Sequence, residues 1–575
     1  MNLYGLHIRG SARFAMLFLM LLFSFFLQNE ISAAEECSVA PELVRNAWES
    51  QQRRFEAYID EAGRNMHQAR GLVALLKAED MLDSVPHPEV IERLYAQITA
   101  ADKASLDMRL AALWGRHRLA SEKADFDGIT RSLDALGLIR HWAVIGPFDN
   151  EGGIGHDREY PPESVIDPSA VYEGKIRPVA WREYPDINGV NGWQSFSTVF
   201  NPSENVSAYA YTEIRSDKAR KVLLWLAAGG AVKVWLNDRL IYDLNIDRNP
   251  YRWDDALETS LGAGVNRILV KVSVKEGAWG FRLGLLDEKG NAIQGLQAVR
   301  HGEKGTALPS ESRMWTQRSM YAKFHPLAIR ELETVLSEKG VPQQKRAETA
   351  LMLAYLYRET GNYDRPSRMD EERISKALAL APKDPECHML AARIFRDHNR
   401  RYAHLLEAAR LMPDSGRPAL ALGRFYRRQG LETESLRQYD KAALDPRTLA
   451  GAVAGRGIIY NNHGLAACSL NEKTQLAAVK PAPRRVALML AAQLDRAGRS
   501  TAAAAVRQEL RNAVRSDTGT ARRLYDYHRG RADFEASLEI IKEIIRFQQT
   551  SLSDRLSHGR LLEGRGLLSE AAAVF

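Results

Sequence analysis

The chain has 575 residues, of which 45% are hydrophobic and 26% are charged, a balance that excludes a fully disordered protein. This length favours several domains over a single core. The net charge of +7 is uneven, because residues 301–575 carry +13 and the remaining residues carry −6. Arginines are scattered along amphipathic helices and no recognition motif accompanies them, so we expect no nucleic-acid partner.

The N-terminal residues 1–34 have the pattern of a signal peptide. His7, Arg9 and Arg13 precede an uncharged stretch over residues 14–27, and the small residues of Ser32-Ala33-Ala34 follow. That stretch is shorter than the roughly 20 residues that span a bilayer. We therefore predict export to the periplasm or the cell surface, with membrane attachment only if the signal is kept as an uncleaved anchor.

Residues 35–140 are predicted to be helical. Val44, Trp48, Phe55 and Ile59 recur at the spacing of one helix face. The segment fits either a pair of degenerate helical repeats or a small helical cap, and the pattern does not separate these two.

Residues 141–300 change to strand signals and contain seven of the ten tryptophans. Val232, Val234 and Leu236 alternate with Lys233 and Trp235, so Trp235 is expected on the opposite face of its sheet. Short β-prone runs separated by Gly, Asn and Asp predict an antiparallel β-sandwich.

Two stretches of this segment resemble known families. The runs VLLWLAAGGAVKVWLNDRLIYD, LGAGVNRILVKV and GAWGFRLGLLDEKG resemble galactose-binding-like jelly-roll modules, with Asp238 where glycine is usual. The run HWAVIGPFDNEGGIGHDREYPPE resembles part of large exported bacterial proteins. Those proteins join a β-sandwich to tetratricopeptide repeats and often continue into a transglutaminase-like domain. The resemblance implies a jelly roll, and sugar binding is a possible but not general property of such modules.

Residues 301–575 are predicted to form a helical repeat array. Gly430, Gly464 and Gly498 are 34 residues apart, and each follows a helix-type apolar run. The units resemble tetratricopeptide repeats, which implies an α-solenoid that binds proteins or peptides in a groove. The last ten residues, from Gly566 on, are predicted to be the turn and second helix of a further repeat, so the array is expected to end within a repeat. A natural truncation, a fragment and a cap supplied by a partner all remain open.

Binding residues are predicted at two places. The loop residues Tyr251, Arg252, Trp253, Asp254 and Asp255 combine an aromatic plane with hydrogen-bonding groups, the mixture of a glycan site. In the repeat groove we predict polar contacts from three arginines of the expected repeat helices, Arg393, Arg424 and Arg427.

Catalytic and metal chemistry have little support. Asp149, Glu151 and Asp157 could supply oxygen ligands to Ca²⁺, but we favour a glycine-rich turn whose acids cap neighbouring elements. No disulfide framework is expected from the three cysteines Cys37, Cys387 and Cys468, and the last two are predicted to be small buried hydrophobic residues. We expect no catalytic residue and no cofactor.

These observations favour an exported, non-enzymatic scaffold or adaptor that holds a partner protein or peptide in its repeat groove. One alternative is a carbohydrate-binding surface module that acts through the β-sandwich. Another is a truncated member of a transglutaminase-like family without its catalytic domain.

Overall fold

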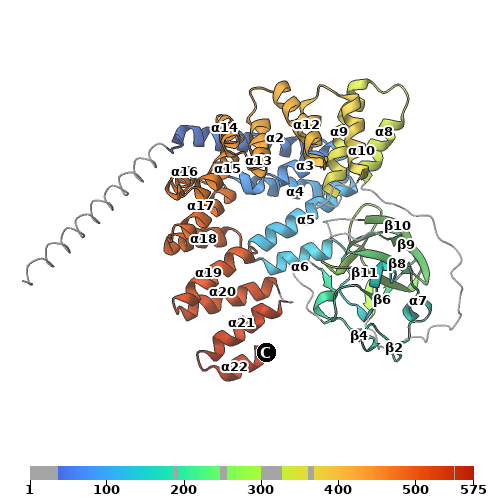
Figure 1. Ribbon diagram of the computed structural model, residues 1–575. Coiled ribbons are helices and arrows are strands. Elements are labelled where there is room, and N and C mark those ends of the chain that lie inside the picture. Colours follow the sequence, from blue (N-terminus) through green and yellow to red (C-terminus); the bar gives the residue numbers. More distant parts are fainter. Residues whose placement is uncertain are drawn as a thin grey trace, which may run out of the picture. The chain divides into compact units, whose positions relative to one another are not determined.

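The computed structural model describes residues 37–185, 192–245, 255–299, 327–360, 368–548 and 551–574 (Figure 1). The predicted signal peptide and the loop residues Tyr251, Arg252, Trp253 and Asp254 lie outside these ranges. The chain divides into two compact units. Unit 1 contains the described residues of Met1–Ala57, Ala78–Glu89 and Lys383–Leu510, and unit 2 contains those of Tyr58–Lys77, Val90–Pro382 and Arg511–Phe575.

Unit 2 contains the predicted β-sandwich, and every strand pair in it is antiparallel. The larger sheet has the order β4-β1-β6-β11-β8-β9, with β13 also paired to β6, and the smaller sheet has the order β10-β7-β12-β5. The strands of the larger sheet are β1 (Ala143–Asp149), β4 (Arg182–Glu183), β6 (Val206–Ser216), β8 (Ala231–Leu236), β9 (Arg239–Leu244), β11 (Gly264–Val274) and β13 (Gln297–Val299). Those of the smaller sheet are β5 (Gln194–Ser195), β7 (Arg220–Gly229), β10 (Asp255–Leu261) and β12 (Gly280–Leu286). A short pair, β2 (Val171–Glu173) and β3 (Pro178–Ala180), and the one-turn helix α7 (Pro161–Ser164) lie outside this order.

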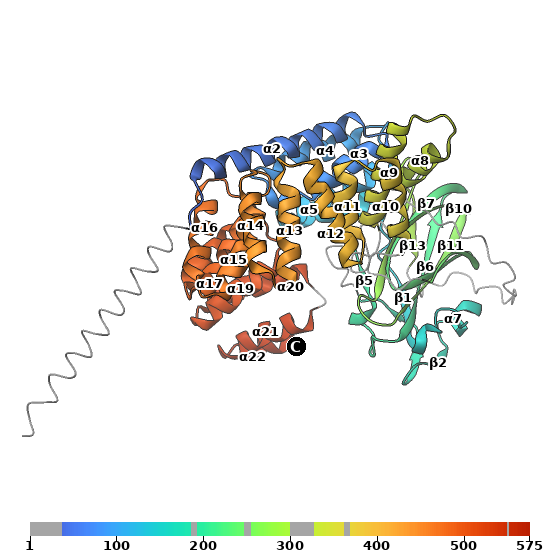
Figure 2. The ribbon, with the colours of Figure 1, turned by 45° about the horizontal axis from the view of Figure 1, so that its top comes forward.

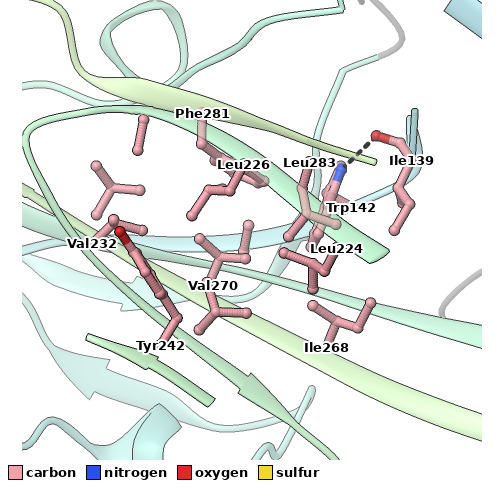
Figure 3. Packing of buried hydrophobic residues seen from close by; sticks show 14 of the residues in the cluster. Ile139, Trp142, Leu224, Leu226, Val232, Tyr242, Ile268, Val270, Phe281 and Leu283 are labelled. Carbon is pink, nitrogen blue, oxygen red and sulfur yellow. Dashed lines mark hydrogen bonds between the residues drawn. The ribbon is translucent and has the colours of Figure 1, made fainter. Parts of the chain in front are cut away.

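The two sheets enclose a core to which alternate residues of the longer strands contribute (Figure 3). Leu224 and Leu226 of β7 pack with Ile268 and Val270 of β11, as the period of two along a strand requires. At one end of this core, the indole N–H of Trp142 donates a 3.0 Å hydrogen bond to the carbonyl of Ile139 (Figure 3). The predicted β-sandwich is confirmed.

Trp235 lies on the outer face of the larger sheet, as its alternation with Val234 predicts. It is nevertheless buried, because the segment that follows β1 folds back over this face. Phe148 stacks on Tyr160 there with ring centroids 4.8 Å apart. A second apolar layer therefore covers the sheet, and Trp235 offers no open stacking surface.

The rest of unit 2 is helical, and its helices come both before and after the sandwich along the chain. They are most of α3 (Ala69–Glu79), then α4 (Ile91–Ala100), α5 (Leu106–Glu122), α6 (Phe126–Ala135), α8 (Leu327–Ser337), α9 (Gln343–Thr360), α10 (Arg368–Leu380), α19 (Thr518–Gly530), α20 (Phe534–Phe547), α21 (Leu552–Glu563) and α22 (Leu568–Val574). Trp114 of α5 packs edge to face on Trp225 of β7, with ring centroids 6.1 Å apart. The ring of Phe126 in α6 contacts that of Phe547 in α20, with centroids 5.4 Å apart. These aromatic contacts join the early helices to both the sandwich and the C-terminal hairpins.

Unit 1 consists of helical hairpins together with the first part of α2 (Pro41–Arg64) (Figures 1 and 2). The hairpin helices are α11 (Pro385–Ile394), α12 (His398–Leu411), α13 (Gly416–Arg428), α14 (Glu432–Ala443), α15 (Leu449–Asn462), α16 (Ala466–Ala478), α17 (Arg484–Arg496) and most of α18 (Ser500–Ala513). A short 3-10 helix, η1 (Leu82–Ser84), also belongs to it. None of the helices in the described ranges is both long and apolar enough to cross a bilayer.

The 34-residue period is carried by the turns inside the hairpins. Gly430, Gly464 and Gly498 all have positive φ, between 70° and 76°. Each turn has the same two backbone hydrogen bonds. In the turn at Gly498, the N–H of Gly498 donates to the carbonyl of Asp495, and the N–H of Arg499 donates to the carbonyl of Leu494. This is the Schellman ending of a helix, in which the left-handed residue is usually glycine. The C-terminal helices are thus a tetratricopeptide-like solenoid, as predicted.

The same turn recurs 34 residues later at Ala532, with φ 57°, and again at Gly566, with φ 76°. Ala532 N–H bonds to the carbonyl of Arg529, and Asp533 N–H bonds to that of His528. Sequence reasoning missed the turn at Ala532 because its only local sign, a glycine, is replaced by alanine.

Candidate functional site

The first part of α2 packs against the repeat helices of unit 1, alongside α13 and α14 (Figure 2). Val44, Ala47 and Trp48 are at most 4% exposed and belong to one apolar cluster. Their spacing of three and four residues places them on one helix face. The cluster also includes apolar side chains of α13, α15 and α17, among them Ala419, Leu449, Val453 and Val486. The repeats thus hold an amphipathic helix of their own chain.

The residues before α2 are fixed to α16. Cys37 forms a disulfide with Cys468, and Asn471 donates a 3.0 Å hydrogen bond to the carbonyl of Cys37. The backbone N–H of Val39 donates to the side chain of Gln475 at 2.5 Å. The sequence indicated no disulfide framework, so this pairing was missed; Cys468 is buried as predicted, but it is not a free thiol. The partners are 431 residues apart, so only folding reveals that they meet.

Beyond α2, η1 is held to the first turn of α17. Arg484 and Asp83 form an ion pair at 2.8 Å, and the side chain of Gln52 accepts a 3.1 Å hydrogen bond from the backbone of His87. Because α2 and η1 both lie against α17 and its neighbours, they form one wall of a pocket whose other wall is the repeat helices.

This pocket has a volume of about 90 Å³. We call it the arginine pocket, after three of its lining residues. It is lined by Trp48 and Gln51 of α2, Ser84 of η1, Leu420 and Arg424 of α13, Arg447, Thr448, Ala450 and Gly451 at the start of α15, and Pro483, Arg485 and Val486 at the start of α17. The absence of a side chain at Gly451 lets Leu420 and Arg424 pack close to this backbone, because a Cβ there would lie 2.8 Å from Leu420 and 3.5 Å from the guanidinium of Arg424.

The charges of the arginine pocket are unbalanced. Arg447 is paired with the buried Asp445 at 2.8 Å. Among the residues that the structure describes, no carboxylate pairs with Arg424 or Arg485. Partial burial and the positive charges of Arg485 and other arginines lower the pKa of Arg424 from its usual value. An arginine stays protonated under such conditions, so the pocket keeps an uncompensated positive potential.

Of the three groove arginines predicted from the sequence, the structure places Arg424 in the arginine pocket. Arg393 and Arg427 lie on α11 and α13 but do not line it. Sequence reasoning missed Trp48, Arg447 and Arg485 as its further lining residues. Arg447 and Arg485 stand near the starts of successive repeat units, which is the signal that could have found them, whereas nothing local links Trp48 to the repeats.

The predicted glycan loop is described only at its last residue. Asp255 opens β10, where it is buried and pairs in register with Leu226 of β7. The other four residues of that prediction lie outside the described ranges, so the glycan site stays a prediction.

The three residues of the weak Ca²⁺ prediction do not converge. Asp149 and Glu151 both form ion pairs with Lys175, at 3.3 and 2.7 Å. The carboxylate of Asp157 instead accepts a 3.3 Å hydrogen bond from Asn245. Within the described part of the chain, no group of three or more His, Cys, Asp or Glu residues is arranged to hold a metal ion. The local geometry agrees with a turn whose acids bind neighbouring groups.

The stretch that contains these acids is anchored by a buried lysine. Lys271 of β11 is fully buried, and its ammonium donates hydrogen bonds to Glu163 at 2.6 Å and to the carbonyls of His156 and Arg158. Burial lowers the pKa of Lys271 to about 8, even though Glu163 acts in the opposite direction. Each of the three ammonium donors has an acceptor, so this cluster fastens the segment to the sheet.

Comparisons with known proteins give only remote likenesses. No protein-family description and no curated protein matches the chain. PilW, a widely conserved type IV pilus biogenesis factor, is 19% identical over 36% of this chain and 97% of its own, with a TM-score of 0.30. PilF of Pseudomonas aeruginosa is 14% identical over 37% and 96%, also with a TM-score of 0.30. In the APC/C hetero-tetramer Cut9–Hcn1, the identity is 13% over 41% of this chain and about half (49%) of that chain, with a TM-score of 0.31. Likenesses at this level carry no argument about function.

Proposed function

We propose that this protein is an exported, non-enzymatic scaffold that binds a partner protein or peptide at the inner face of its repeats. The observation that carries the proposal is the packing of α2 on α13, α15 and α17. Apolar side chains such as Val44 and Trp48 are held there by burial on the repeat helices. A surface that binds one amphipathic helix in this way has the shape and apolar character to hold a further polypeptide segment beside it.

Export is supported by the disulfide between Cys37 and Cys468. Disulfides persist in the periplasm and outside the cell and are rare in the reducing cytosol. The N-terminal signal pattern described above agrees with this compartment.

Site-specific photocrosslinking of the full chain in cells tests the proposal. A photoreactive residue at Ala450, in the wall of the arginine pocket, is expected to crosslink a discrete partner protein. The same residue at Arg437, an exposed position on α14, is the control and is expected to give no such product. A third position, the exposed Val265 of β11, reports on the β-sandwich.

The proposal fails if Ala450 gives no protein adduct, or if its adducts are the same as those from Arg437. Adducts from Val265 alone would move the binding activity to the sandwich and favour the carbohydrate-binding module, which a glycan array with the full chain would then test.

A further inference from the structure

The arginine pocket has more hydrogen-bond donors than acceptors. Arg424 and Arg485 both keep solvent-exposed surface, although the Arg424 guanidinium is partly buried, and neither pairs with a carboxylate among the residues that the structure describes. A guanidinium carries five N–H donors in a planar fork that matches the geometry of a carboxylate. Two acids next to the pocket are already paired: Asp445 is engaged by Arg447 and by the backbone N–H of Gly416 at 2.7 Å, and Asp83 by Arg484.

A second, independent observation concerns Trp48. Its side chain is 4% exposed and lines the arginine pocket, yet its indole N–H has no acceptor within the described part of the chain. A buried donor without a partner costs roughly 1–3 kcal/mol, so buried indoles usually find one. An acceptor that enters the pocket, with a small shift of the surrounding side chains, would remove that cost.

We propose that the arginine pocket is a binding site for the carboxylate of an acidic residue in the partner polypeptide. This inference rests on the proposed function, because it names the chemistry of the segment that the repeats would hold. Arg424 and Arg485 would bind the carboxylate oxygens, and Trp48 would supply an apolar wall and one further N–H donor. A volume of about 90 Å³ has room for a few water molecules or for one small acid group in their place.

The carboxylate is favoured over other anions for two reasons. The anionic groups that an unmodified polypeptide carries are carboxylates, so a polypeptide partner supplies them without further chemistry. The small volume of the pocket, about 90 Å³, also limits the size of the group that can enter. We therefore expect one Asp or Glu side chain to enter at a time.

Calorimetric titration of the full chain with two defined probes tests the inference. The first probe is an N-acetylated, C-amidated hexapeptide of alternating Glu and Ala, and the second replaces each Glu by Gln. We expect saturable binding of the Glu peptide and at least roughly tenfold weaker binding of the Gln peptide, because charge-assisted hydrogen bonds are lost. Inorganic phosphate is titrated as a third probe.

A matched pair of double variants locates the binding. Arg424→Gln with Arg485→Gln is expected to weaken binding of the Glu peptide roughly tenfold or more. The control, Arg437→Gln with Arg499→Gln, removes the same charge from exposed positions of the same unit and is expected to leave binding unchanged. All four side chains are exposed, so neither variant should disturb the fold.

Three results would overturn the inference: equal binding of the Glu and Gln peptides, an equal loss in both double variants, or tighter binding of phosphate than of the Glu peptide with the same arginine dependence. The last result would identify a site for a free inorganic anion. The two proposals can fail separately. If Ala450 still crosslinks its partner when Arg424 and Arg485 are changed, the scaffold stands and the carboxylate site is wrong.

Discussion

The left-handed turn residues of the repeats allow a reciprocal test of the fold. Gly498 and Ala532 stand at equivalent places, 34 residues apart, with φ of 70° and 57° and the same two turn hydrogen bonds. Replacing each residue by the other, Gly498→Ala and Ala532→Gly, should therefore shift local stability in opposite directions.

The magnitude follows from backbone sterics. A left-handed conformation costs a residue with a Cβ about 1–2 kcal/mol. Glycine avoids that strain, but it lowers the free energy of unfolding by roughly 0.5–1 kcal/mol, because glycine gives the unfolded chain more conformational freedom. Ala532→Gly should thus gain about 0.5–1 kcal/mol. Gly498→Ala should lose about the same amount by backbone strain alone, since a Cβ at Gly498 would meet no atom within 4 Å.

Hydrogen exchange of the intact protein is the suitable assay, because a chain of several units does not unfold as one two-state system. Amides of α19 and α20 should exchange several-fold more slowly in Ala532→Gly, and those of α17 and α18 should exchange faster in Gly498→Ala. Ala532→Ser keeps the Cβ and serves as the control, with no gain expected. Slower exchange in Ala532→Ser, or no gain in Ala532→Gly, would refute the reasoning.

Three further predictions concern buried groups. The unfolded, unreduced protein should take up one equivalent of iodoacetamide, at Cys387, and three after reduction; three without reduction would rule out the Cys37–Cys468 disulfide. In the native protein Cys387 should not react, because burial and nearby acids raise the pKa of its thiol to about 12. Burial and the charge of Arg282 lower the pKa of His117 to about 4, so the unfolded chain takes up a proton first as the pH falls. The stability that His117 contributes is complete above pH 6.5 and is lost between pH 6.5 and about 4, so the protection of α5 amides, corrected for the intrinsic exchange rate at each pH, should fall over this range and fall less in His117→Gln. Tyr439→Phe removes a buried hydroxyl that has no partner among the described residues. The free energy of opening of α14, measured by hydrogen exchange, should therefore stay the same or rise by up to about 1 kcal/mol. Faster exchange in α14 would contradict this.

Several features were predictable because they depend on local patterns. Alternation along residues 231–236 places Val232 and Trp235 on opposite faces of a strand, and the structure confirms both faces. The spacing of Gly430, Gly464 and Gly498 likewise reveals the repeat, because a helix end with positive φ favours glycine. Ala532 marks the limit of this reasoning, since tertiary packing can impose the same turn on a residue that disfavours it.

The arginine pocket and the disulfide depend instead on contacts between distant residues. By itself, the sequence determined the element types and the repeat period. Only the tertiary structure brought Trp48 of α2 beside Arg485 of α17 and joined Cys37 to Cys468. The physical reason is that local patterns record which face of an element is apolar, whereas the partner of that face is chosen by the packing of the whole chain.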